Sequence, residues 1–217
     1  AAAKPSIKSG TSCESCHWAS SDWLAPHDNY GGKDVKRDQE AADHKVKRIA
    51  DSKAAGLIWP SMKYEIAENC MTCHGLANPG LKADDLAKML GAGHPINPSF
   101  ELVKYSQGSV RHRHYAPNMK VNAEMTPKEL AELYVIGQAA ALVSAVGAIS
   151  KSEEAKYKEA QNKRVENATA VLKKIPEAAG LLAAPSRENA LKMSQAISGK
   201  DLTGVVGDML PAKSDYK

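Results

Sequence analysis

All four cysteines of the chain fall into two pairs with the same spacing and the same following residue. The two segments are Cys13-Glu-Ser-Cys16-His17 and Cys70-Met-Thr-Cys73-His74. Cys-x-x-Cys-His is the attachment motif of c-type haem. The two thiols bond to the porphyrin, and the adjacent histidine binds the iron from the same side. We therefore expect two covalently bound haems, with His17 and His74 as iron ligands.

Other sites built from paired cysteines fit this pattern less well. A zinc ribbon usually has roughly 15–20 residues between its pairs, whereas the 53 residues 17–69 separate the pairs here. A thioredoxin-like redox motif needs a strand-helix-strand pattern, which the sequence lacks. Two structural disulfides stay open as an alternative for an exported protein. None of these sites explains a histidine directly after both pairs.

The composition is that of a folded chain with few aromatic rings. Its 217 residues are enough for one domain, or for a compact head with an extension. Hydrophobic residues at 43% and charged residues at 25% exclude a disordered or fibrous chain. No stretch approaches the roughly 20 apolar residues of a membrane-spanning helix, so we expect no membrane span. Phe100 is the single phenylalanine, and two haems would replace the missing rings in the core.

The first 125 residues look like a loop-rich region with short helices around the cysteine motifs. Helices are expected over residues 40–55, 63–74 and 84–90. In the second of these, Ile66, Cys70 and Cys73 recur at helical spacing. Residues 1–32 should be mostly loop. Residues 91–120 form a long irregular stretch, which is usually functional and here would wrap a haem.

From Thr126 onward the sequence predicts long helices. Thr126-Pro127-Lys128-Glu129 is a capping box that opens a helix to about Ile149, and further helices are expected over 152–175 and 185–197. The helix over 152–175 has an apolar face. Its basic face consists of Lys156, Lys158, Lys163, Arg164, Lys173 and Lys174. The predicted fold is all-α: a loop-rich dihaem c-type cytochrome head, residues 1–125, with a C-terminal long-helix hairpin, residues 126–217, packed on it.

Each haem needs one iron ligand besides His17 or His74, and that ligand decides function. A strong protein ligand makes an electron carrier, whereas an open position makes a catalyst or gas binder. The further histidines are His27, His44, His94, His112 and His114. Their number favours two histidines on each iron. Met119 is the competitor, because Pro117-Asn118-Met119 resembles the loop that supplies methionine in small high-potential cytochromes.

Several segments resemble multihaem c-type cytochromes related to the tetrahaem cytochrome of ammonia oxidisers and to hydroxylamine oxidoreductase. These segments are 13–27, 53–58, 64–74, 91–95, 100–102 and 105–112. The resemblance implies electron-transfer haems with histidine ligands at His27, His94 and His112. Trp18 stands where the family has glycine, and we expect its indole to press against the first haem. The further upstream Cys-x-x-Cys-His that family members usually carry is absent here, so three matched histidines serve two haems.

The pairing of these histidines with the haems follows from chain length. His27 lies only ten residues after His17, so it reaches a neighbouring haem more easily than the far face of its own. His94 is far enough along the chain to return to the first haem. We therefore expect His94 on the first haem and His27 or His112 on the second. His44 is expected to be a surface residue.

Two functions follow from this ligand set. The favoured one is a dihaem c-type cytochrome that transfers single electrons between redox partners and has no catalytic residues. The alternative is a haem enzyme or sensor with one open axial position, acting on nitrogen oxides, peroxide or a diatomic gas. Haem attachment of this kind takes place outside the cytoplasm, and the start Ala1-Ala-Ala-Lys4-Pro5 is typical of a chain after signal-peptide removal. We expect a periplasmic or otherwise exported protein.

The net charge of +4 is mild, but residues 102–123 contain no Asp or Glu. The basic residues in that stretch are Lys104, Arg111, Arg113 and Lys120. They could pair with haem propionates, steer an acidic redox partner or form a solvated face, and the three uses stay open. No interleaving of basic and aromatic residues supports nucleic-acid binding.

The Ala-rich helix has no charged residue over 135–150. A helix that is apolar on every side must be buried on every side. Either a second copy of the chain covers its last face, in a homodimer, or Leu181, Leu182 and the third helix cover it within one chain.

Overall fold

In the computed structural model, which describes residues 12–115 and 118–217, every regular element of the described chain is a helix. The β-type pairing found there is one isolated bridge between His114 and Asn122. The predicted all-α class is confirmed. The segment Ala1-Ala-Ala-Lys4-Pro5 and Pro117 of the methionine loop lie outside the described residues.

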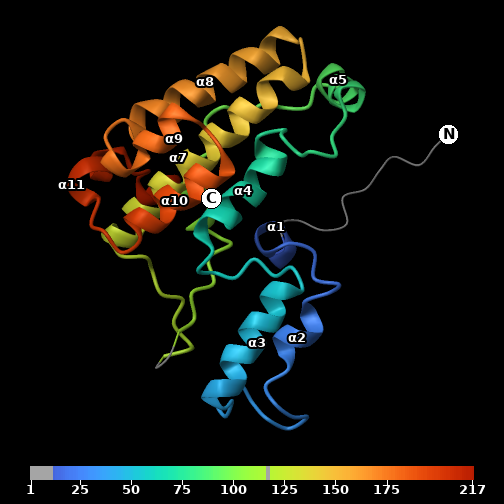
Figure 1. Cartoon of the computed structure of the whole chain (residues 1–217), viewed down its shortest axis with the longest axis vertical. Helices are drawn as coiled ribbons and strands as arrows, with labels where there is room; N and C mark the ends of the chain where they lie inside the picture. Colours follow the sequence, from blue (N-terminus) through green and yellow to red (C-terminus); the bar gives the residue numbers. More distant parts are fainter. Residues whose placement is uncertain (1–11, 116–117) are drawn as a thin grey trace, which may run out of the picture. The chain divides into compact units, whose positions relative to one another are not determined.

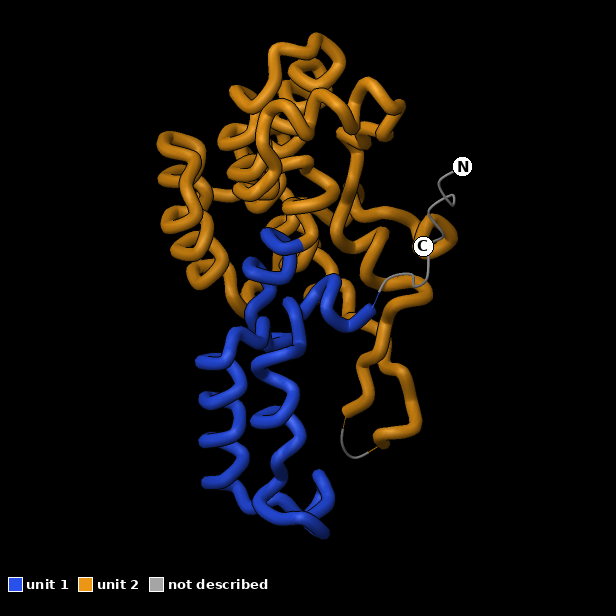
Figure 2. The backbone as a smooth tube through the Cα atoms, turned by 90° about the vertical axis from the view of Figure 1, so that its right-hand side faces the viewer, with its two compact units in different colours: residues 1–69 blue, residues 70–217 orange. Residues whose placement is uncertain are grey.

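The chain forms two compact units, Ala1–Asn69 and Cys70–Lys217 (Figure 2). The division falls inside helix α4 (Lys63–His74), directly before the second cysteine motif. We predicted a domain boundary after residue 125, at the end of the haem-binding head, and this boundary stays a prediction. The second motif shares its unit with the helical extension.

Over its described residues, 12–69, the first unit contains three helices besides the first turns of α4. They are α1 (Cys13–His17), α2 (Leu24–Asp28) and α3 (Ala42–Ala54). Helices α2 and α3 lie side by side (Figure 1). α3 buries the polar residues Arg48 and Ser52, and Arg48 can be buried because it takes part in an ion pair. Val46 of the same helix is 69% exposed.

The second unit is built on two long neighbouring helices, α7 (Pro127–Ala148) and α8 (Ala155–Leu172), joined through the 3-10 turn η1 (Ile149–Lys151) (Figure 1). The other elements are α5 (Ala83–Gly91), α6 (Leu102–Ser106), η2 (Pro176–Ala178), α9 (Ala179–Ala183), α10 (Arg187–Ile197), α11 (Thr203–Val206), η3 (Gly207–Met209) and η4 (Lys213–Asp215). The capping box forms as the sequence predicts: Thr126 accepts from the Glu129 N–H, and Glu129 accepts from the Thr126 N–H.

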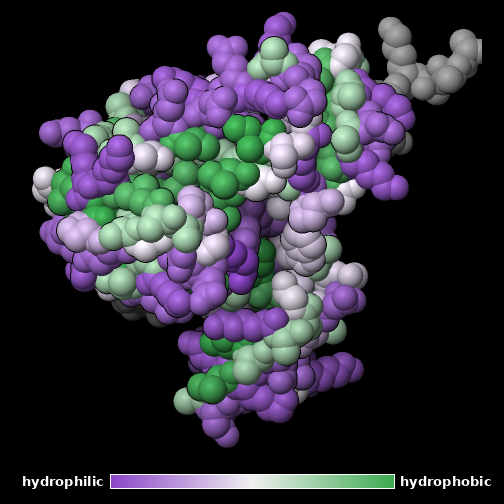
Figure 3. Space-filling model, turned by 45° about the horizontal axis from the view of Figure 1, so that its top comes forward, coloured by the Kyte–Doolittle hydropathy of each residue, from purple (hydrophilic) through white to green (hydrophobic). Residues whose placement is uncertain are grey.

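Helix α7 is the core of the second unit, and all its residues from Ala131 to Leu142 are buried. From the sequence we expected no stretch long and apolar enough to span a membrane. The helical segment Pro127–Lys151, 25 residues long, meets both criteria by length and composition alone. Within the fold, 61% of the most apolar 18-residue stretch of this segment is buried. Helices α6, α8, α10 and α11 pack against it, so we interpret it as a core helix. Hydrophilic side chains cover much of the surface around α8 (Figure 3).

Candidate functional site

The first motif occupies a single helical turn, α1. Ser12 caps this turn, and its N–H donates to Ser15 Oγ at 3.2 Å. Residues three and four apart on a helix share one face, so Cys13, Cys16 and His17 face the same side. Cys13 is exposed and Cys16 is half-buried, which puts the first motif at the protein surface.

One residue, Ile58, fixes His17 through two hydrogen bonds. Nδ1 of His17 donates to the Ile58 carbonyl at 2.6 Å, and the Ile58 N–H donates to the His17 carbonyl at 3.2 Å. A carbonyl oxygen can only accept, so Nδ1 carries the proton and the basic lone pair is on Nε2. Metal-binding histidines are commonly oriented by a carbonyl on their other ring nitrogen. His17 therefore has the tautomer that an iron ligand requires.

Helix α1 ends at Trp18 in an unusual backbone conformation. Its φ is 71° and its ψ is 168°, a region populated almost only by glycine. The Trp18 side chain is 52% exposed, and its carbonyl accepts from Trp23 Nε1 at 3.2 Å.

His27, on α2, lies in an aromatic pocket of the first unit. Its ring meets those of Trp23 and Trp59 edge-on, with centroids 5.7 and 5.8 Å away. Its buried Nδ1 has no hydrogen-bond partner among the described residues. Burial is the main cause that lowers the pKa of His27, and the charges of Arg48 and Arg37 lower it further against the opposing charge of Asp28. The ring is therefore held in the neutral form that binds metals.

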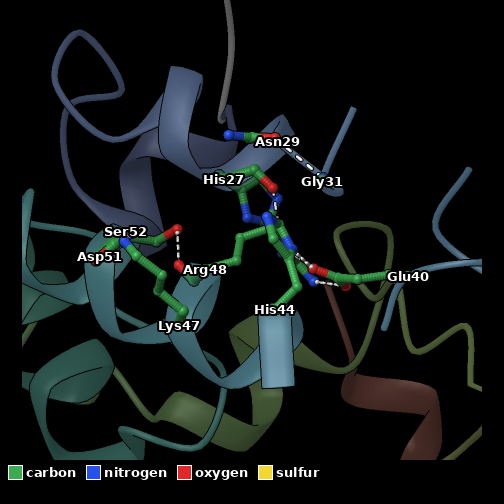
Figure 4. Close-up of polar contacts among 9 residues, drawn as sticks. All are labelled: His27, Asn29, Gly31, Glu40, His44, Lys47, Arg48, Asp51 and Ser52. Atoms are coloured by element: carbon green, nitrogen blue, oxygen red, sulfur yellow. Dashed lines mark hydrogen bonds and ion pairs between the residues drawn. The ribbon is translucent and has the colours of Figure 1, made fainter. Parts of the chain in front are cut away.

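A buried arginine holds the backbone at His27 (Figure 4). Arg48, on α3 and 5% exposed, donates from Nη1 to the His27 carbonyl at 3.1 Å. Its Nε and Nη2 donate to the two carboxylate oxygens of Glu40, at 2.7 and 2.8 Å. These bonds are the main cause that lowers the pKa of Glu40 to about 2. His44, predicted to lie on the surface, is instead half-buried and donates from Nδ1 to Glu40 at 2.9 Å.

The second motif ends α4, and aromatic rings cover one face of its histidine. The His74 ring stacks on that of Phe100, with centroids 3.9 Å apart and planes 13° apart, and the Tyr105 ring lies 5.8 Å away. The rest of His74 stays exposed. Burial of the covered face is the main cause that lowers the pKa of His74, and the charge of Arg164 adds to it. The only phenylalanine of the chain therefore supports a candidate iron ligand.

Three side chains on successive turns of α8 hold the backbone that ends the second motif. Tyr157 Oη donates to the Leu76 carbonyl at 3.2 Å, and Gln161 Nε2 donates to the Gly75 carbonyl at 2.8 Å. Arg164 Nη2 donates to the His74 carbonyl at 3.1 Å. A helix leaves its last carbonyls without partners inside the helix, and α8 supplies donors for those of α4. The placement of Arg164 on the outer basic face was wrong, because Arg164 is 2% exposed.

The other predicted ligands lie in loops of the second unit. His94 is exposed, donates from Nδ1 to the Pro95 carbonyl at 2.9 Å and lines a groove of about 880 Å³ beside α8. His112 is exposed and donates from Nδ1 to the Val110 carbonyl at 2.9 Å. Met119 is 41% exposed. Both histidines repeat the tautomer of His17, and their pairing with one or the other haem stays a prediction.

The basic stretch over residues 102–123 is partly neutralised within the second unit. Arg111 lies 3.6 Å from a carboxylate oxygen of Glu124, and Arg113 lies 2.7 Å from one of Glu129. Because these two arginines already have acidic partners, steering of an acidic redox protein would depend mainly on the remaining lysines.

The cysteines and histidines described above fit a covalently attached haem at each motif. None of the four cysteines, all in the described part of the chain, forms a disulfide. The described residues contain no cluster of three or more His, Cys, Asp or Glu placed to hold a bare metal ion. Haem iron makes no such demand, because the porphyrin supplies four of its ligands.

No protein-family model matches the chain, and no match is found among curated proteins or among solved structures. The resemblance to multihaem cytochromes therefore rests on the sequence motifs alone.

Proposed function

We propose that the chain is an exported, periplasmic dihaem c-type cytochrome that passes single electrons between redox partner proteins. The observation that carries the proposal is the repeated Cys-x-x-Cys-His motif on a helical turn, with a histidine whose ring is fixed by its surroundings. Cys13, Cys16, Cys70 and Cys73 would hold the porphyrins through thioether bonds. His17 and His74 would bind the two irons on one side, and His94 with His27 or His112 on the other.

The residues around the histidines supply what an electron carrier needs. A haem iron with two histidine ligands accepts and releases one electron without an open position for a substrate. Phe100 covers one face of His74, and two tryptophans enclose His27. Arg48 and Arg164 hold the backbone at these two histidines. Rigid ligands keep the iron environment the same in both oxidation states.

The number of haems tests the proposal directly. The chain is expressed in a periplasm that contains the c-type haem attachment machinery, and its intact mass is measured. We expect two covalently bound haems, and one in each of the double variants Cys13→Ser with Cys16→Ser and Cys70→Ser with Cys73→Ser. A wild-type chain without covalent haem, or with another number, would refute the proposal.

The coordination of the irons separates the carrier from an enzyme or gas sensor. We expect low-spin ferric signals in electron paramagnetic resonance and no carbon monoxide binding by the reduced protein. A high-spin signal or ready carbon monoxide binding would point to an open axial position.

The role of His94 is tested by His94→Met. One haem should then change to a methionine-histidine spectrum with a higher reduction potential, since methionine raises it. Unchanged spectra would move the assignment to His27 and His112, which are tested by the same substitution.

A further inference from the structure

Both candidate sites contain a buried arginine that donates to the backbone carbonyl of a candidate iron ligand. In the first unit, Arg48 donates to the carbonyl of His27 at 3.1 Å. In the second, Arg164 donates to the carbonyl of His74 at 3.1 Å. The two side chains are 5% and 2% exposed. The two sites therefore offer a natural comparison.

The two arginines differ in how their charge is balanced. Arg48 forms two hydrogen bonds with the carboxylate of Glu40, which is itself buried, so the pair is neutral overall (Figure 4). The acceptors around Arg164 are the His74 carbonyl, the Asn97 carbonyl at 2.8 Å and Gln161 Oε1 at 2.5 Å, and all are uncharged. Among the described residues, no carboxylate oxygen lies within 4.0 Å of its guanidinium.

A buried charge without a counter-charge is costly. It also acts strongly on any charge change nearby, because the dielectric response of the interior is weak and salt does not screen it well. Reduction of a ferric haem to a ferrous haem removes one positive charge from the iron. A positive group fixed beside the iron ligand therefore favours the reduced state.

We propose that Arg164 raises the reduction potential of the haem bound at His74 and makes this haem the electron-accepting member of the pair. The inference rests on the proposed function. With both haems bound, the haem held by Cys70, Cys73 and His74 would take up an electron at a higher potential than the haem held at His17, and no bond would be formed or broken. Arg48 gives no comparable bias, because Glu40 cancels its charge. Arg164 does not bind the iron. It holds the backbone of His74 through a hydrogen bond, and its charge acts on the haem from that position.

Redox titration of the two-haem protein, followed by absorption spectra, tests this assignment. In Arg164→Met one of the two midpoint potentials should fall by about 59 mV or more, which is about a tenfold change in the equilibrium constant for a one-electron couple. Arg164→Lys keeps the charge and should retain most of the potential. Gln161→Glu keeps the arginine but places a carboxylate against it, and should lower the same midpoint.

Two measurements separate charge from structural damage. Lys173→Met removes a positive charge from the exposed C-terminal end of α8 and should shift neither midpoint appreciably, since solvent screens that charge. Haem content and helical circular dichroism are measured on every variant. If Arg164→Met does not fold, Gln161→Glu decides. Two bound haems whose midpoints stay fixed in the Arg164 and Gln161 variants would overturn this inference alone. A chain without haem would overturn the proposed function as well.

Discussion

Trp18 has the backbone conformation that glycine tolerates best, although it carries the largest side chain of all. A non-glycine residue in this region costs about 1–3 kcal/mol. The strain persists because the residue before it, His17, is bound to Ile58 through both its ring and its carbonyl. The direction of the chain after the motif is therefore set by the histidine, and Trp18 has to follow it.

This strain can be measured by comparing two substitutions at Trp18. Trp18→Ala and Trp18→Gly both remove the indole, but only glycine removes the strain. We predict that the glycine variant has a free energy of unfolding higher than that of the alanine variant by about 1 kcal/mol. Elsewhere glycine is usually the less stable of the two by about 0.5–1 kcal/mol. Denaturant unfolding of both variants gives the answer, and the usual order would show that Trp18 is not strained.

Gly75 is constrained by space instead. A Cβ at this position would lie 2.5 Å from the Met71 carbonyl and 2.5 Å from Ser144 Oγ on α7. We predict that Gly75→Ala lowers the free energy of unfolding by about 1–3 kcal/mol, as overpacking does. Gly91→Ala is the control, because nothing lies within 4 Å of the added carbon there. Equal thermal stabilities of the two variants would contradict the close approach.

Helix α3 is fixed within the first unit by a buried ion pair. Its Arg48 joins two segments, binding the Glu40 carboxylate that precedes the helix and the His27 carbonyl of α2. The pKa of Glu40 is about 2 in the folded protein, against an ordinary value of 4.5. The depressed pKa ties the stability of this unit to pH.

We predict that this contribution is complete above pH 4.5 and is lost as the pH falls toward 2, because the folded state then has to bind a proton at a carboxylate that prefers to be ionised. Thermal unfolding of the wild type and of Glu40→Gln is followed between pH 7 and pH 2. The difference in midpoint between them should be largest near neutral pH and shrink below pH 4. A difference that stays constant with pH would assign the acid sensitivity to other groups.

The elements of the second unit show what sequence patterns can and cannot reveal. The Thr126–Glu129 capping box and the helix over 63–74 were predictable, because caps and spacing are local signals. The role of Arg164 was not, because charged residues are usually exposed and its two backbone acceptors lie 67 and 90 residues away. One signal was present: Arg164 lies seven residues after the buried Tyr157, so it shares the helix face that packs inward.

At the scale of the whole molecule, the burial of α7 bears on the oligomeric state. The chain itself covers every residue from Ala131 to Leu142, whereas Val146 remains 40% exposed. We predict that sedimentation at micromolar concentration shows a monomer, because too little of the helix is left uncovered for a stable apolar interface. A species of twice the mass would favour the homodimer, and Val146→Glu should then dissociate it.

The bonds from α8 to the second motif also imply an order of assembly. His17 and His27 meet partners 41 and 21 residues away in the chain, but the carbonyls of His74, Gly75 and Leu76 meet theirs after 90, 86 and 81 residues. Contacts between distant parts of a chain close more slowly than local ones. In a chain that emerges from its N-terminus, the surroundings of the first motif can form while α8 has yet to appear. Under the proposed function, the second motif would remain unpacked for longer, and its two thiols would have time to react with haem before α8 packs against it.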